Sequence, residues 1–131
     1  MRYLLASALA VVIGLSAFRA EAKSNSIIGS WSGSGTAKGD SGNRGTARCQ
    51  ITYTKGSGSN YNVRADCTVS KIGAISQTAS VRKVGANRYS GSFHNIQHSV
   101  SGKFNVVLTG SGQRVTMTSE RGTASLKLAK H

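Results

Sequence analysis

The residues of this chain that could carry out catalysis are few, with 4 acids, 3 histidines and 2 cysteines. The 131 residues include 17 Lys and Arg but only 4 Asp and Glu, for a formal net charge of +13. Catalysis by paired carboxylates needs two acids in one cleft, whereas Asp40, Asp66 and Glu120 lie far apart in the sequence. Asp66 alternates with Arg64, so we expect a surface charge pair that keeps the carboxylate ionised.

The sequence contains no motif for nucleophilic catalysis either. A Ser-His-Asp triad assembles in space, so spacing alone does not exclude one. A G-x-S-x-G elbow is absent, however, because Trp31 occupies the central position of the segment from Gly29 to Gly33. A cysteine nucleophile is disfavoured if the two cysteines are paired. We therefore expect a protein that is not an enzyme.

The candidate metal ligands are the histidines His94 and His98, with His131 at the end of the sequence. His94 and His98 are four residues apart, and we expect the segment 95–97 to turn the chain between them. A loop could still bring the two imidazoles together, but no carboxylate or thiolate lies nearby in sequence to complete a site. The glycine-rich segments lie between or inside predicted strands and are typical of turns, not of nucleotide loops. We expect no metal and no cofactor.

The start of the chain predicts export. Arg2 precedes an almost wholly apolar run from Tyr3 to Phe18, and the segment 20–22 (Ala-Glu-Ala) matches the small-x-small pattern of a signal peptidase site. The run is shorter than the roughly 20 residues that span a bilayer. We expect residues 1–22 to be a signal peptide and residues 23–131 to be one domain, periplasmic or secreted.

The two cysteines then belong to an oxidising compartment, where an even pair usually forms a disulfide. If Gly58 is the centre of a hairpin, Cys49 faces Cys67, Ile51 faces Ala65 and Tyr53 faces Val63. Directly opposed residues of an antiparallel pair lie close enough for a disulfide bond. We therefore predict a Cys49–Cys67 disulfide.

Apolar and polar residues alternate with a period of two from Ile28 onward, which predicts strands. Turn-forming residues separate these runs at 39–45, 56–60, 85–87, 110–112 and 120–122. Eight strands with short connections favour an antiparallel up-and-down barrel, which removes exposed edges; a two-sheet β-sandwich is the alternative. Mid-strand glycines Gly33, Gly91 and Gly102 favour closure, because a small barrel needs sharply bent strands.

The face of each strand opposite its apolar residues carries the charge. Seven cations are expected to point outward: Arg48, Arg64, Arg82, Arg88, Lys103, Arg114 and Lys127. Asp66 is the only acid among these outward positions. Such a cationic girdle would attract an anionic lipid surface or envelope polymer, although a solvated surface that only maintains solubility would look the same. Export disfavours nucleic acid as a physiological partner.

Four segments of the chain resemble a group of small exported bacterial β-barrel proteins: Trp31–Gly35, Arg48–Tyr53, Asn87–Phe93 and Ala124–Leu128. The resemblance implies a location and a fold but no activity. The segment from Gly29 to Trp31 resembles calycin-type barrels, which implies that Trp31 plugs one barrel end or contacts a ligand. An early tryptophan followed by a cysteine pair is similar to periplasmic barrel inhibitors of metalloproteases.

Together these patterns predict an exported, non-enzymatic binding or structural protein of the cell envelope that interacts electrostatically with anionic surfaces or polymers. The alternative is a periplasmic inhibitor of a hydrolase, or a small-ligand carrier, that uses the barrel mouth.

Overall fold

A computed structural model describes residues 26–95 and 99–131. The predicted signal peptide at 1–22 and His98 lie outside the described residues. Eight strands follow one another in these ranges: β1 Gly29–Gly39, β2 Arg44–Lys55, β3 Asn60–Val69, β4 Gly73–Gly85, β5 Arg88–Asn95, β6 Val100–Thr109, β7 Gly112–Ser119 and β8 Gly122–Lys130.

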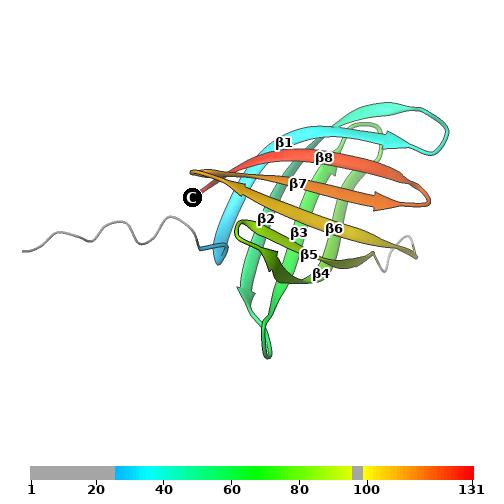
Figure 1. The fold of residues 1–131 in the computed structure, drawn as a ribbon. Helices are drawn as coiled ribbons and strands as arrows, with labels where there is room; N and C mark the ends of the chain where they lie inside the picture. Colours follow the sequence, from blue (N-terminus) through cyan, green and yellow to red (C-terminus); the bar gives the residue numbers. More distant parts are fainter. Residues whose placement is uncertain (1–25, 96–98) are drawn as a thin grey trace, which may run out of the picture.

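The strands form one closed antiparallel barrel in sequence order. Each strand pairs with the next, and β1 pairs with β8 from Trp31–Lys130 to Gly39–Gly122. Figure 1 shows β1 and the red β8 running side by side where the barrel closes. The up-and-down barrel is thus confirmed, and the sandwich alternative is excluded because no sheet edge remains between the first and last strands.

The predicted register of the β2–β3 hairpin is confirmed. Cys49 faces Cys67, Ile51 faces Ala65 and Tyr53 faces Val63. Gly58, at the centre of the turn, has a φ of 62°, a conformation that glycine adopts without steric cost.

Glycines allow the strands to bend tightly around the lumen. A Cβ at Gly91 would lie 1.7 Å from the carbonyl oxygen of Ser80, and one at Gly35 would lie 1.8 Å from that of Ser125. Backbones of adjacent strands therefore approach where any side chain would collide. Gly33 and Gly102 show the same close approach, as expected from a barrel with sharply coiled strands.

The two ends of the barrel differ in their side chains. We call the end with the β2–β3, β4–β5 and β6–β7 turns the closed end, and the end with the β1–β2, β3–β4 and β7–β8 turns the open end. The closed end holds the largest buried side chains, Trp31 and Tyr53, with Ile51 and Leu128 packed around them. Bulky residues fill this half of the lumen.

Candidate ligand chamber and basic surface

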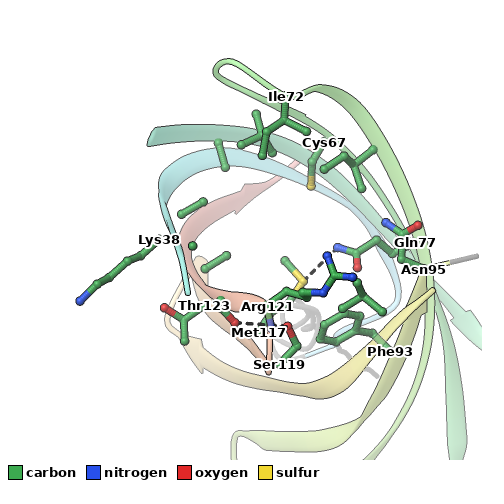
Figure 2. Close-up of a pocket in the computed structure, with 18 of the residues that line it drawn as sticks. Lys38, Cys67, Ile72, Gln77, Phe93, Asn95, Met117, Ser119, Arg121 and Thr123 are labelled. Carbon is green, nitrogen blue, oxygen red and sulfur yellow. Dashed lines mark hydrogen bonds between the residues drawn. The ribbon is translucent and has the colours of Figure 1, made fainter. Parts of the chain in front are cut away.

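The open half of the lumen contains a cavity of about 450 Å³, which we call the chamber (Figure 2). Its walls come from all eight strands and from the turns at the open end. The side chains used below are Gln77, Phe93, Met117, Arg121 and Ala124, together with the Cys49–Cys67 disulfide. The cavity volume lies within the range of small-molecule sites.

The chamber lies where the inward residues of β1, β2 and β8 become smaller toward the open end. Along β1 the inward row runs from Trp31 through two glycines to Ala37. Along β8 it runs from Leu128 through Leu126 to Ala124, and β2 begins its inward row with Ala47. Since small residues from these strands meet at one level of the barrel, their side chains leave a cavity between them.

Two amides bring polarity into this apolar space. The Gln77 Nε2 donates to the Met117 sulfur at 3.4 Å, and a thioether is only a weak acceptor. Asn95 is 4% exposed and also lines the chamber. The Gln77 amide is therefore a hydrogen-bonding group that a ligand could engage more strongly than the sulfur does.

Arg121 places a positive charge at the mouth of the chamber, where Lys38 and Asp40 also line the cavity. It lies in the β7–β8 turn, and its carbonyl oxygen accepts a hydrogen bond of 3.0 Å from the backbone N–H of Asp40. Figure 2 shows the Arg121 side chain extending over the lumen, whereas Lys38 points away from it. An arginine at the rim of an apolar cavity favours a ligand that carries an anionic group.

The disulfide forms part of the chamber wall. Cys49 and Cys67 are bonded across β2 and β3, with their Cα atoms 4.1 Å apart. Both residues are buried and both line the chamber. The predicted pairing is confirmed.

Trp31 lies in the closed half, away from the chamber lining. It is 1% exposed, and its indole Nε1 donates to the carbonyl oxygen of Ile27 at 2.9 Å. The Lys130 ammonium lies 5.3 Å from the ring centroid and donates to the carbonyl oxygen of Ser26. A residue that plugs one end of the barrel would occupy this position. A residue that contacts a ligand in the chamber would line the chamber, which Trp31 does not. The plug role stays a prediction.

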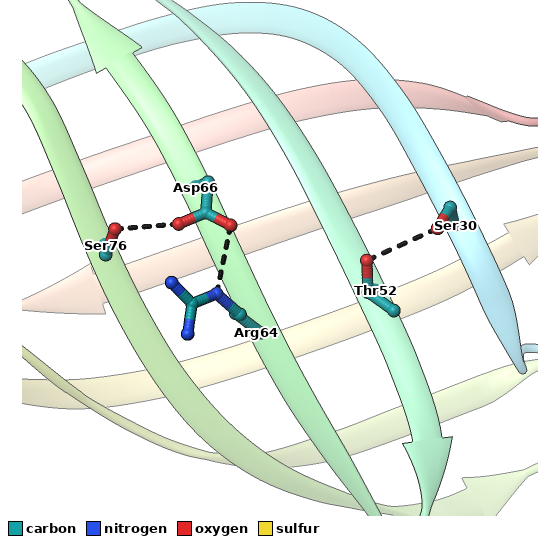
Figure 3. Close-up of polar contacts among 5 residues, drawn as sticks. All are labelled: Ser30, Thr52, Arg64, Asp66 and Ser76. Carbon is teal, nitrogen blue, oxygen red and sulfur yellow. Dashed lines mark hydrogen bonds and ion pairs between the residues drawn. The ribbon is translucent and has the colours of Figure 1, made fainter.

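The pairing expected at Asp66 is present on the outer surface (Figure 3). Arg64 Nε lies 3.1 Å from the carboxylate, and the Ser76 hydroxyl donates to the other carboxylate oxygen at 2.7 Å. These two hydrogen bonds hold the pKa of Asp66 below its ordinary value. The same view shows the hydrogen-bonded hydroxyls of Ser30 and Thr52 on the neighbouring strands.

All seven cations expected on the outside of the barrel are exposed. Three of them lie in one row across neighbouring strands, since Ser34 of β1 faces both Arg48 and Lys127, and Lys127 in turn faces Arg114. Directly opposed like charges destabilise a sheet. Whether these residues bind an anionic surface stays a prediction.

The candidate metal ligands do not form a cluster in the described part of the chain. His94 points outward, and its Nδ1 hydrogen-bonds the Ser101 hydroxyl at 2.8 Å. Within residues 26–95 and 99–131, no three His, Cys, Asp or Glu side chains gather where they could hold an ion. No helix in these ranges has the length and apolarity of a membrane span.

Sequence reasoning missed Gln77 and Arg121. Gln77 occupies an inward position between Ile75 and Ala79, where alternation alone had marked only the apolar neighbours. Arg121 lies in a turn, where a charged residue is ordinary. A polar residue at an inward register position is the signal that could have identified Gln77.

Comparison with solved structures identifies the architecture. No protein-family model and no curated protein matches the chain. A redesigned β-barrel bound to DFHBI, mFAP1, superposes with a TM-score of 0.65 at 12% identity, covering 80% of this chain and 94% of that one. The fold is that of a small β-barrel. A second redesigned barrel, b11L5F_LGL, gives a TM-score of 0.64 at 15% identity over 80% of this chain and 91% of that one.

A fluorescence-activating β-barrel designed de novo gives a TM-score of 0.61 at 11% identity, covering 80% of this chain and 94% of the other. At these identities the likeness concerns the fold alone. The resemblance to exported bacterial proteins and to metalloprotease inhibitors stays a prediction.

Proposed function

We propose that this barrel is a non-enzymatic binding protein that takes a small, mainly apolar molecule with an anionic group into its open end. The chamber of about 450 Å³ carries the proposal. Its walls are mainly apolar, Gln77 offers an amide inside it, and Arg121 extends over its mouth. The barrel mFAP1, which has a similar fold, is bound to DFHBI in its structure.

A matched pair of fluorescent probes tests this proposal. Anilinonaphthalene sulfonate combines an apolar body with an anion, and phenylnaphthylamine is its neutral counterpart. Both should bind with enhanced, blue-shifted fluorescence. Ala124→Phe should weaken both by about tenfold or more, equivalent to ~1.4 kcal/mol, because the ring fills the chamber.

Ala129→Phe is the matched control, because Ala129 lies on the outer face of the same strand and is exposed. Arg121→Gln should weaken the sulfonate probe about fivefold, as expected for an exposed ion pair of ~1 kcal/mol, and leave the neutral probe unchanged. Equal effects of the two phenylalanine variants would show that the probes bind outside the chamber and would overturn the proposal.

A second candidate function is electrostatic adsorption to an anionic surface or polymer of the cell envelope. The opposed Arg114 and Lys127 favour it, because a pair of like charges costs stability and solubility alone is served equally well by mixed charge. Lys127→Gln should weaken binding to anionic vesicles by less than the about fivefold expected for a cation next to the bilayer, and the free energy of unfolding should stay equal or rise. A loss of stability without a loss of binding would contradict this function.

The location that suits both functions is the periplasm or the outside of the cell. The Cys49–Cys67 disulfide is compatible with an oxidising compartment, and the signal-like segment at 1–22 supports export. Mass spectrometry of the protein produced in a bacterium should find an N-terminus at Lys23. The inhibitor alternative stays a prediction, since no observation on the described residues favours it.

A further inference from the structure

Charge is distributed unevenly along the barrel. The three acidic side chains of the described residues are Asp40 in the β1–β2 turn, Glu120 in the β7–β8 turn and Asp66 in the middle of β3. The first two therefore lie at the open end, and Asp66 is paired with Arg64. The turns and strand ends of the closed end carry no Asp or Glu within residues 26–95 and 99–131.

Four cations and one aliphatic residue gather at the closed end around the β4–β5 hairpin. We call this surface the basic pole; its residues are Lys55, Arg82, Lys83, Val84 and Arg88, all exposed. The backbone N–H of Leu108 donates to the carbonyl oxygen of Asn87 at 2.8 Å, which holds the hairpin turn against β6.

Aromatic contacts make the basic pole continuous. The Lys55 ammonium lies 4.8 Å from the centroid of the Tyr61 ring. That ring meets Tyr89 edge to face, with centroids 5.6 Å apart. Tyr89 faces Lys83 across the β4–β5 ladder. Lys55 on one hairpin and Lys83 on the next are thereby linked.

Val84 is the apolar element of the basic pole. The β4–β5 register shifts between Lys83 and Gly85, so Val84 is a bulged residue that the ladder skips. Bulges re-aim side chains, and Val84 is 57% exposed. A single exposed aliphatic residue is ordinary on a protein surface. Ile72 at the open end follows the single cation Lys71, whereas Val84 belongs to a hairpin that carries Arg82, Lys83 and Arg88.

We propose that the basic pole docks the barrel onto a bilayer containing anionic phospholipids, with Val84 entering the headgroup boundary and the chamber mouth facing away. The inference deepens the second candidate function, electrostatic adsorption, and rests on it. Cations attract anionic headgroups, and an aliphatic side chain gains from the acyl boundary. A hydrated polysaccharide offers nothing comparable to Val84, so a lipid surface is the favoured partner.

Charge-matched variants test the orientation. The pole variant is Arg82→Gln with Lys83→Gln and Arg88→Gln. The control is Arg44→Gln with Arg48→Gln and Lys103→Gln, which removes three exposed cations outside the basic pole and outside the chamber lining. Flotation with vesicles of phosphatidylcholine and phosphatidylglycerol should show the pole variant weakened about a hundredfold, at about fivefold per cation near the surface. The control should be weakened much less.

A fluorescent label reports which end enters the bilayer. A cysteine carrying an environment-sensitive dye is placed at Val84, or at Ile72, which is 63% exposed at the open end and also lines the chamber. Each spectrum is compared with that of the same labelled protein without vesicles. Adding anionic vesicles should shift the dye at position 84 to the blue and leave the dye at position 72 unchanged. Circular dichroism of each variant verifies the fold.

The possible results distinguish a wrong orientation or a wrong partner from a failure of adsorption itself. Equal weakening by the pole and control variants, or a shift at position 72 in place of 84, would overturn the orientation and leave adsorption intact. Tight binding to soluble polygalacturonate with no dye shift on vesicles would overturn the lipid partner. If the unmodified protein does not bind anionic vesicles or polygalacturonate at low salt, adsorption itself fails.

Discussion

At the scale of single residues, the least expected feature is a polar pair inside the closed half of the barrel. The Tyr53 hydroxyl donates to Gln113 Oε1 at 2.6 Å, and both residues are buried. Gln113 Nε2 is buried without a hydrogen-bond partner among the described residues, and an unsatisfied buried donor costs stability. The core therefore contains a polar pair that is only partly satisfied.

A double-mutant cycle measures this pair. Tyr53→Phe alone should lower the free energy of unfolding by about 1–3 kcal/mol, because Gln113 then loses its only described partner. Combining it with Gln113→Leu should recover most of that loss, since no buried polar group remains. Urea unfolding at neutral pH gives both values; additive losses would contradict the interpretation.

The same tyrosine predicts sensitivity to alkali. Burial raises the pKa of the Tyr53 phenol well above its ordinary value of 10.0, and this effect outweighs the lowering by the hydrogen bond to Gln113. A raised pKa in the folded state means that this stability is fully present below about pH 10 and is lost as the pH rises further. Burial also raises the pKa of Tyr89.

Unfolding midpoints in urea should accordingly fall above pH 10 in the unmodified protein. They should fall less steeply in Tyr53→Phe, which has one fewer phenol to ionise on unfolding. Parallel slopes for the two proteins would show that Tyr53 does not control alkaline unfolding.

At the scale of elements, the β2–β3 hairpin determines the strand register, the disulfide and part of the chamber wall. Its turn sets the register, the register brings the two cysteines together, and the disulfide then becomes part of the chamber wall. A local element thereby shapes a cavity that all eight strands enclose.

Replacing both Cys49 and Cys67 by serine should lower the free energy of unfolding by about 3 kcal/mol, as expected for a loop that joins residues 18 positions apart. Urea unfolding measures the loss, and probe binding reports on the chamber wall. Free thiols found by mass spectrometry in the exported protein, or an unchanged urea midpoint, would contradict the structural role of the bond.

At the scale of the whole molecule, closure depends on the contact between the first and last strands. Gly35 of β1 faces Leu126 of β8, and a Cβ at Gly35 would lie 2.8 Å from the Leu126 Cα as well as against the Ser125 carbonyl. This seam joins residues from opposite ends of the chain, and its pairing closes the barrel.

Gly35→Ala should therefore destabilise the barrel by about 1–3 kcal/mol, in the range of overpacked cores. Ser34→Ala is the matched control, because Ser34 is the exposed neighbour on the same strand; it should change the stability by less than about 0.5 kcal/mol. Thermal unfolding of the two variants measures the difference, and equal stabilities would show that the seam tolerates a side chain.

Much of the candidate surface could be predicted because it depends on neighbours along one strand. Alternation assigns Arg48 or Lys103 to the outer face without reference to any other strand, and the structure exposes both. Which end of the barrel is basic could not be predicted in the same way. It depends on where each strand begins and ends relative to the others, which places Asp40 and Glu120 together at the open end.

The sequence by itself determined the strands, the inward and outward faces, the β2–β3 register and the disulfide, because each follows from a period of two and one local turn. The tertiary structure decided between the predicted closed barrel and the sandwich alternative. It also decided the partner of Gln113, the chamber in the open half of the lumen and the position of Arg121 over it. The physical reason is that the size of a cavity depends on the volumes of side chains that several strands place at one level of the barrel. Strand pairings across the whole chain determine which residues share that level.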